Sequence, residues 1–329
     1  MSENFEFKIK PDESQRPALG GSELIYNRVL NRLNDELKDE FVFIMQRVRD
    51  HHMDNDKKKI LWLEDLPEDP ESSHLKDPKS RERFCKFVFP SNWAMWDFHQ
   101  KLGVPYEDSI VIPNCIEPIP VHEKPKTDKK KIIYFSTPHR GLNILESVIR
   151  LMEDARNDFE VDVYSSFKIY GRDEQDEMPE FQELYGRLNE LKSVNYHGSV
   201  SNDVIRKSLA ETHILAYPST YLETSCLVAI ESMAAGCLAV IPNYGALAET
   251  GKDFSHMYQW SPDIQQHAAT HYHYLCNALN TFWTDSVQSI LDLQIIYYNY
   301  FYSMDMCANR WNSLLLNLSD NRNLGSANN

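Results

Sequence analysis

The sequence predicts an α/β protein with two doubly wound domains that face each other across a central cleft. Short apolar, β-rich segments alternate with helical segments of about ten or more residues, as in parallel sheets covered on both faces. A segment rich in proline and lysine, at 117–131, interrupts this alternation, which then begins again. In such sheets ligands bind at the carboxyl ends of the strands, so we expect the site in the cleft.

The interruption divides the chain into parts. We expect an N-terminal domain over 1–118, a linker over 119–131 and a C-terminal domain over 132–295. The remaining residues, 296–329, include a helical, aromatic-rich segment that we expect to cross back to the N-terminal domain.

Periodicity predicts the elements of the first domain. A pattern of apolar residues predicts a helix over 22–38, with Ser22 as its candidate N-cap. The expected strands lie in 4–10, 40–48, 58–65 and 108–118, and a strand followed by a helix fills 83–103, with Gly103 closing the helix.

The second domain repeats the strand–helix pattern in a regular order. The expected strands lie in 131–137, 160–166, 194–200, 213–219 and 238–243, and the expected helices begin at Leu142, Glu180, Asp203 and near Thr224.

Composition narrows the class of protein. With 329 residues, 42% hydrophobic and 12% aromatic, the chain can build two cores. It has no apolar run of about 18 residues that could span a membrane. The charged N-terminus lacks a signal-peptide core, and the six cysteines are scattered without a CxxC pair, so we expect a cytoplasmic protein.

The formal net charge of −15 argues against a nucleic-acid partner, because such binding relies on clustered lysine and arginine. The basic clusters are short and are expected to be solvated loops or helix faces; they lie at 57–59, 79–86 and 129–131.

The stretch YPSTYLETSCLVAIESMAAGC, at 217–237, carries two carboxylates inside an otherwise apolar or small run. Glu223 lies just before the expected helix, and Glu231 lies two turns inside it. An acid in an apolar helix is costly to bury without a partner. Glu231 could accept hydrogen bonds from a ribose diol, or it could pair with a lysine or arginine elsewhere in the chain.

The start of this helix is a candidate phosphate site. Thr224 or Ser225 can cap the helix, and the free N–H groups of Cys226 and Leu227 then point toward the space beside Glu223. The alternative is that Glu223 is an ordinary acid favoured by the helix dipole.

Two further loops carry groups suited to a diphosphate. FSTPHRGLNILESV, at 135–148, places His139 and Arg140 between a strand and a helix, where an arginine can grip a diphosphate. PALGGSEL, at 17–24, contains Gly20 and Gly21, which let backbone approach a ligand closely. The alternatives are a surface arginine and a flexible turn.

Together these motifs resemble the GT-B glycosyltransferases, specifically the retaining family 4, also called group 1. ETSCLVAIESMAAG resembles the family's signature of two glutamates separated by seven residues and followed by small residues and glycine. The other segments that carry the resemblance are GGSE, VIPNCIEP, HRGL, NYHGSV and NYGALAET, the last with Gly245 and Glu249.

The resemblance implies that the N-terminal domain is the acceptor side and that the C-terminal domain binds the nucleotide sugar. It also implies a role for each matching residue. Arg140 would neutralise the leaving diphosphate, Glu223 would bind the hydroxyls of the donor sugar, and Glu231 would bind the ribose. These two, Arg140 and Glu223, are the implied catalytic residues. The remaining donor-binding residues that it implies are Gly20, Gly21, His139, Gly198, Ser199, Val200, Thr224, Ser225, Cys226 and Leu227.

The sequence departs from the family at three places. Ser136 stands where the family usually has a second basic residue, and Thr224-Ser225-Cys226 replaces the usual Gly-Phe-Gly. Where many relatives have a histidine in the N-terminal domain, this chain has Glu64 and Asp65. We take these two acids as acceptor-side candidates; the alternative is an acidic loop.

The resemblance implies a retaining, metal-independent glycosyltransferase of the hexosyltransferase type, with a UDP- or GDP-sugar as donor and no cofactor. The acceptor would be a hydroxyl of a glycan, a lipid or a small molecule. Two other functions stay open: a phage-type enzyme that glycosylates DNA, and a sugar-nucleotide hydrolase or epimerase of the same fold. The base, the sugar, the acceptor and the oligomeric state are not specified by the sequence. A zinc site at His267 and His271 is disfavoured, because no third ligand stands nearby.

Overall fold

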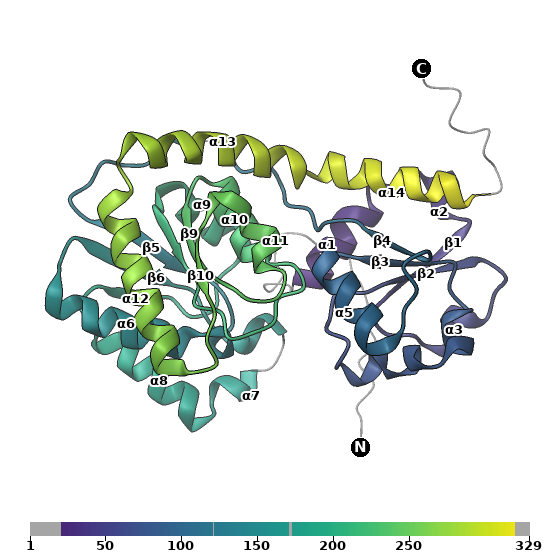
Figure 1. Ribbon diagram of the computed structural model, residues 1–329, viewed down its shortest axis with the longest axis horizontal. Coiled ribbons are helices and arrows are strands. Elements are labelled where there is room, and N and C mark those ends of the chain that lie inside the picture. The colour runs from purple at the N-terminus through teal and green to yellow at the C-terminus, as the bar shows by residue number, and fades with distance from the viewer. Residues whose placement is uncertain (1–20, 121, 171–172, 320–329) are drawn as a thin grey trace.

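The computed structural model describes residues 21–120, 122–170 and 173–319. The strand expected at 4–10, and Gly20, lie outside the described residues. Figure 1 shows two groups of elements side by side, with one long helical segment running across both.

The N-terminal domain contains a parallel sheet of four strands in the order β1-β2-β3-β4. Their bounds are Phe41–Met45 for β1, Lys58–Trp62 for β2, Lys86–Phe89 for β3 and Ser109–Val111 for β4. The described helices of this domain are α1 Gly21–Leu30, α2 Asp35–Lys38, α3 Asp50–Met53, α4 Pro78–Arg81 and α5 Asn92–Leu102, with a 3₁₀ segment at Pro70–Lys76.

Two helix ends in this domain follow local sequence rules. Ser91 caps α5 by accepting a hydrogen bond from the Ala94 amide at 3.0 Å, and Gly103 ends it with φ 71°. The single helix expected over 22–38 is instead divided into α1 and α2. The Asn34 side chain starts α2 by accepting a bond from the Leu37 amide at 3.1 Å, because asparagine is a strong N-cap.

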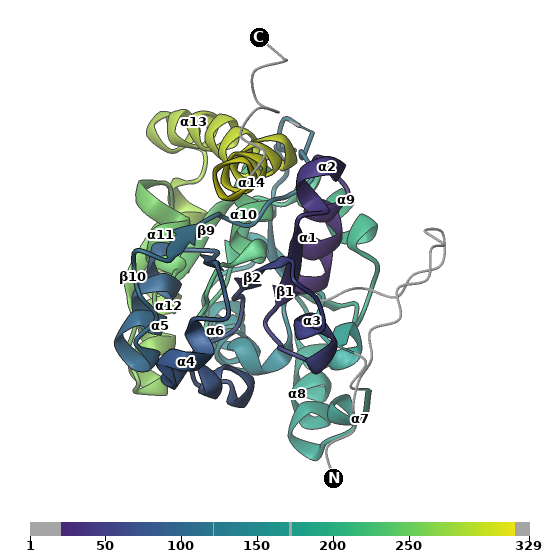
Figure 2. The same ribbon diagram turned by 90° about the vertical axis from the view of Figure 1, so that its right-hand side faces the viewer.

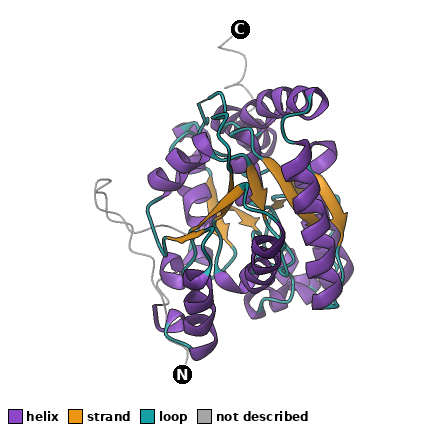
Figure 3. Ribbon diagram, turned by 90° about the vertical axis from the view of Figure 1, so that its left-hand side faces the viewer, coloured by secondary structure: helices purple, strands orange, loops and turns teal. Residues whose placement is uncertain are grey.

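The C-terminal domain contains a parallel sheet of six strands in the order β10-β9-β8-β5-β6-β7. Figure 3 shows the strands of this domain between helices. The strands are β5 Lys130–Tyr134, β6 Phe159–Val163, β7 Val194–Tyr196, β8 Ile214–Ala216, β9 Leu238–Asn243 and β10 His256–Gln259. The described helices are α6 Leu142–Ala155, α7 Asp173–Asp176, α8 Pro179–Glu190, α9 Asn202–Glu211, α10 Leu227–Ala234, α11 Leu247–Gly251 and α12 Ile264–Thr281, with 3₁₀ segments at Pro138–Arg140, Phe167–Tyr170 and Lys252–Phe254.

The strand order of this sheet reverses between β5 and β8, which are neighbours. Chain connections leave β5 and β8 toward opposite sides of the sheet at such a switch point, so a crevice opens between the loops that follow them. The candidate site lies there. The two parallel sheets with flanking helices confirm the predicted fold class.

The last two helices, α13 Asp285–Phe301 and α14 Met304–Leu318, join the domains (Figures 1 and 2). α13 packs on the C-terminal domain against α10, and α14 packs on the N-terminal domain. The ring of Trp311, on α14, lies 4.7 Å from that of Trp62, at the end of β2. The described part of the chain has no helix that is both long and apolar enough to cross a bilayer.

Candidate active site

The crevice of the C-terminal sheet is formed by the loop after β5 and the loop after β8. A glycine lets these loops touch. Gly141 has φ 103°, and a Cβ atom added to it would lie 2.0 Å from the carbonyl oxygen of Pro218. Only glycine fits this close approach, so Gly141 allows the two loops to touch.

Arg140 and Glu223 meet in this crevice as a buried ion pair. Nη1 of Arg140 donates to both carboxylate oxygens of Glu223, at 2.8 and 3.0 Å. The Glu223 side chain is only 4% exposed and that of Arg140 is 21% exposed. Breaking a pair this deeply buried by removing one partner leaves a charge without compensation, which is strongly unfavourable.

Two tyrosines complete the surroundings of the pair. The Tyr217 hydroxyl donates to Oε1 of Glu223 at 2.6 Å, and the guanidinium carbon of Arg140 lies 4.3 Å from the centre of the Tyr221 ring. Burial, with the Glu223 charge adding to it, raises the pKa of Tyr217 well above its usual value. Tyr217 therefore stays protonated and acts as a hydrogen-bond donor to Glu223.

The loop after β9 holds the backbone of Glu223 in place. The Ala246 amide donates to the Glu223 carbonyl at 2.7 Å. Gly245 has φ 61°, and a Cβ atom on it would lie 2.7 Å from the same carbonyl oxygen. Backbone atoms of the NYGALAET segment thus pack against the backbone of Glu223 and hold it in place.

The helix that follows Glu223 begins differently from the prediction. We expected Thr224 or Ser225 as its N-cap, but the N-cap of α10 is Cys226, and its side chain makes no capping hydrogen bond. The Thr224 hydroxyl instead crosses the cleft and donates to the carbonyl of Glu64 at 2.6 Å. Burial raises the pKa of the Cys226 thiol well above its ordinary value, so the group stays neutral.

Glu231 has a protein partner from the other domain. Nη2 of Arg28, on α1, lies 3.6 Å from its Oε1, and both side chains are largely buried. Arg28 also donates to the Cys115 carbonyl at 3.0 Å. Burial raises the pKa of Glu231, while the charges of Arg28 and Arg206 act in the opposite direction. The structure therefore realises the ion-pair alternative, and the ribose role stays a prediction.

Gly198, Ser199 and Val200 line a hollow of about 40 Å³ at the carboxyl ends of β5, β6 and β7. Ser136 and Tyr164 also line this hollow. It lies on the side of the sheet next to the Arg140 loop, because β5 ends at that loop and β6 is its neighbour.

His139 lies beside the ion pair. Its ring stacks on Phe167, with ring centres 5.4 Å apart, and meets the edge of Tyr221 at 6.1 Å. The carbonyl of His139 accepts a bond from the Thr220 hydroxyl at 3.1 Å. The imidazole is therefore part of an aromatic cluster that borders Arg140.

The two acceptor-side candidates have different environments. Glu64 is buried, and its carboxylate accepts bonds from Trp62 Nε1 at 2.6 Å and Asn114 Nδ2 at 2.8 Å. Burial raises the pKa of Glu64 to about 7. The pKa of Asp65 is also raised, because burial and the charge of Asp69 outweigh the opposing charges of Arg47 and Arg140. The positive charge of Arg140 thus favours the ionised form of Asp65.

Gln46 holds the backbone of both acids. It has φ 61°, an uncommon conformation for a residue other than glycine. Its side-chain oxygen accepts hydrogen bonds from the amides of Glu64 at 2.9 Å and Asp65 at 3.0 Å. Strained residues of this kind persist where their surroundings hold them.

Leu227 is the first residue of α10, directly after its N-cap Cys226. Gly21 is the first residue of α1. His267 and His271 share the Tyr258 hydroxyl, at 2.8 and 3.1 Å, and burial lowers their pKa values to about 4 and about 3. Within the described ranges, no group of three or more His, Cys, Asp or Glu side chains could hold a metal ion.

Three residues of this site were missed by the sequence reasoning. Tyr217 ends the buried strand next to Glu223, and its position before the loop is a signal that could have been used. Tyr221 lies in the same loop as Glu223. Arg28 carries no local signal, because its partner lies in the other domain.

Comparison with known proteins adds a family assignment for part of the chain. Residues 120–271, which contain Arg140, Glu223 and Glu231, match the family model described as Glycosyl transferases group 1. A search of curated protein sequences gives no match.

Several solved structures share the fold. A glycosyltransferase from Rickettsia africae ESF-5 is 14% identical, with a TM-score of 0.67 over 95% of this chain and 84% of that chain. Anabaena Alr3699/HepE, solved in complex with UDP, is 16% identical, with a TM-score of 0.62 over 79% of this chain and 72% of that one. A sucrose-phosphate synthase from Thermosynechococcus elongatus is 13% identical, with a TM-score of 0.60 over 82% and 70%. At these identities the likenesses show the shared fold.

Proposed function

We propose that this protein, a glycosyltransferase by the domain at 120–271, transfers a sugar from a nucleoside diphosphate sugar to an acceptor hydroxyl. We further propose that the reaction retains the anomeric configuration and needs no metal ion or cofactor. The observation that carries the proposal is the Arg140–Glu223 pair, set between the hollow at Gly198 and the N-terminal acids.

The donor would lie along the carboxyl ends of the strands of the C-terminal sheet, with its base, ribose and diphosphate at different positions along that edge. The base would bind at the hollow lined by Gly198 to Val200, which would have to open beyond its present volume of about 40 Å³, and the ribose would approach Glu231. The diphosphate would lie between Arg140 and the first amides of α10, where both the guanidinium and the helix dipole favour negative charge. We favour UDP over GDP as the nucleotide, since the Anabaena protein of similar fold was solved with UDP and with UDP-glucose.

Binding of the donor would rearrange the ion pair. Arg140 would turn part of its hydrogen bonding from Glu223 to the diphosphate, and Glu223 would then accept bonds from the sugar hydroxyls. The Tyr217 hydroxyl, already bonded to Glu223, limits the energetic cost of this exchange because the carboxylate keeps one donor.

In the transfer step the bond between the anomeric carbon and the diphosphate oxygen breaks, and the acceptor oxygen forms a new bond to the same face of that carbon. The proton of the acceptor hydroxyl passes to the departing phosphate. Arg140 and the α10 amides stabilise the charge that develops on the leaving group, which is the main catalytic contribution of the chain. Holding the acceptor in place supplies much of the rest.

All six cysteines are free thiols, which supports the cytoplasmic location that we propose. The acceptor that we propose is a hydroxyl of a glycan, a lipid or a small molecule.

The proposal is tested by a thermal-shift screen against UDP, GDP and ADP, followed by assays with the matching sugars. A ligand that binds the folded state raises the melting temperature, and the rise grows with the logarithm of the ratio of ligand concentration to Kd. We expect stabilisation by UDP and release of UDP from a UDP-sugar that depends on an added acceptor. Release without any acceptor, at the same rate, would favour a hydrolase instead.

A further inference from the structure

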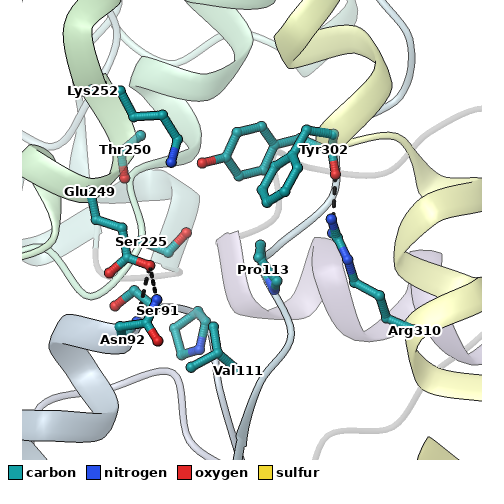
Figure 4. Close-up of a pocket in the computed structure, with 12 residues that line it drawn as sticks. Ser91, Asn92, Val111, Pro113, Ser225, Glu249, Thr250, Lys252, Tyr302 and Arg310 are labelled. Atoms are coloured by element: carbon teal, nitrogen blue, oxygen red, sulfur yellow. Dashed lines mark hydrogen bonds between the residues drawn. The ribbon is translucent and has the colours of Figure 1, made fainter. Parts of the chain in front are cut away.

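A second cavity lies between the two domains, away from the nucleotide side of the crevice. Its volume is about 310 Å³. Its walls come from the carboxyl ends of β3 and β4, from the region of α11, and from the junction of α13 and α14 (Figure 4). Both domains and the crossing helices therefore contribute to a single cavity, which is partly open to solvent.

Two cations line this cavity. Lys252 follows α11, and Arg310 lies on α14. Lys252 Nζ is 5.7 Å from the centre of the Tyr297 ring, and the Arg310 guanidinium is 4.3 Å from that of Phe301. Nη1 of Arg310 also donates to the Phe301 carbonyl at 3.0 Å. The aromatic rings hold both positive groups at the cavity without neutralising their charge.

The carboxylate that lines the cavity is already engaged. Oε1 of Glu249 accepts bonds from the amide and the side chain of Asn92, at 3.1 and 2.7 Å, and Oε2 accepts one from the Trp93 amide at 3.1 Å. Glu249 thus satisfies the N-terminus of α5 across the cleft (Figure 4). The two cations outnumber this acid, so the cavity favours an anion in a chain of net charge −15.

The backbone of Lys252 is unusual. It has φ 46° and ψ −144°, a combination that residues other than glycine rarely adopt. The Lys252 amide donates to the Ala248 carbonyl, which ends α11 and fixes this conformation. From this backbone position the Lys252 side chain lines the cavity.

The cavity also adjoins the donor loop. Ser225 lines it, and Ser225 is two residues from Glu223 and one before the N-cap of α10. A ligand in the cavity would therefore have one end near the expected donor sugar and the other near Lys252 and Arg310. A volume of about 310 Å³ is at the small end of ligand pockets, which suits a compound of monosaccharide size.

From this arrangement we infer that the cavity is the acceptor site, and that the acceptor is a small hydroxyl compound bearing a carboxylate or phosphate group. Lys252 and Arg310 would bind the anionic group, and the attacking hydroxyl would point toward Ser225 and Glu223. The assignment rests on the proposed function, because it names the acceptor for the same transfer.

The test measures anion binding with the donor site filled. In calorimetry with UDP-saturated protein, we expect glucose 6-phosphate to bind about tenfold or more tightly than glucose, as charge-assisted hydrogen bonds to two cations require. Inorganic phosphate alone should bind and compete with glucose 6-phosphate. In the Lys252→Met/Arg310→Gln variant, phosphate binding and the preference should both be lost, while UDP affinity stays as in the wild type.

The matched control is Lys129→Met, which removes an exposed lysine that does not line the cavity and should keep the preference. If the wild-type protein binds UDP but does not bind phosphate, or binds it equally well without Lys252 and Arg310, this inference is wrong. The proposed function is not affected by that result. A wild-type protein that does not bind UDP instead contradicts the proposed function.

Kinetics separates an acceptor from an effector. With an anionic acceptor that is glycosylated, the double variant should raise the acceptor KM about tenfold or more without changing the donor KM. If phosphate sugars change the rate of transfer to another acceptor without competing with it, the cavity is a regulatory site and the acceptor assignment is wrong.

Discussion

Nη1 of Arg140 lies 2.8 and 3.0 Å from the two carboxylate oxygens of Glu223, and this pair connects the loops after β5 and β8. The resemblance assigns one residue to the diphosphate and the other to the sugar, yet the structure joins them directly. We therefore expect a change at either residue to affect both the free energy of unfolding and the binding of the donor.

Arg140→Ala should remove the main stabilisation of the leaving group. We expect kcat/KM to fall by about 10²–10³. The free energy of unfolding should also fall by roughly 1–3 kcal/mol, a value reduced for the partial exposure of Arg140, because Glu223 is left buried and unpaired. Steady-state kinetics and urea unfolding measure the two effects. Arg32→Ala is the control, since Arg32 forms an exposed pair with Asp305. Near-normal turnover in Arg140→Ala would rule out the assigned role.

Glu231→Gln tests whether this acid binds ribose or only holds Arg28. If it binds ribose, the wild type should bind UDP about five- to tenfold more tightly than 2′,3′-dideoxy-UDP, and the variant should bind the two alike. Arg28→Met is the companion variant, because it removes the ion pair but keeps the carboxylate. A ribose preference that survives in Glu231→Gln would assign Glu231 to structure alone.

Glu64 should make stability depend on pH. Its pKa of about 7 in the folded state exceeds the ordinary value of 4.5, so the folded protein binds more protons than the unfolded chain between these values. Stability contributed by the protonated acid is then present at low pH and is lost as the pH rises through this window, by about 3 kcal/mol in all.

The variant Glu64→Gln isolates that effect. The unfolding free energy of the variant, relative to wild type, should rise by about 3 kcal/mol between pH 4.5 and pH 8. Urea titrations at the two pH values give this difference, with the exposed Glu107→Gln as control. A relative stability that does not change with pH would contradict a raised pKa at Glu64.

Gly245→Ala should disturb the site through the backbone. The added Cβ would lie 2.7 Å from the Glu223 carbonyl oxygen, at a residue with φ 61°. We expect a loss of about 1–3 kcal/mol in unfolding free energy, together with weaker donor binding. Gly186→Ala, in α8, is the control: no atom lies within 4 Å of its added Cβ, and it should stabilise the helix by about 0.5–1 kcal/mol. Equal behaviour of the two variants would contradict the close packing of Gly245 on Glu223.

Local pattern was sufficient to predict most of the framework. Alternating apolar segments predicted both parallel sheets, and Gly103 marked the end of α5 because left-handed backbone depends on neighbours in the chain. The same holds for the loops at Arg140 and Glu223, since each follows a strand directly. Their meeting could be expected from a strand order that reverses between them, but not their direct pairing.

The sequence-based predictions failed where a side chain contacts a residue that is distant in the chain. Thr224 was expected to cap α10, but a carbonyl from the other domain offers its hydroxyl a partner at 2.6 Å. Likewise, Arg28 pairs with Glu231 only because the two domains pack together. Lys252 and Arg310 line one cavity for the same reason. Hydrogen bonds and charges act through space, so spacing along the chain identifies the reactive groups, whereas the packing of two domains and α14 decides which of them meet.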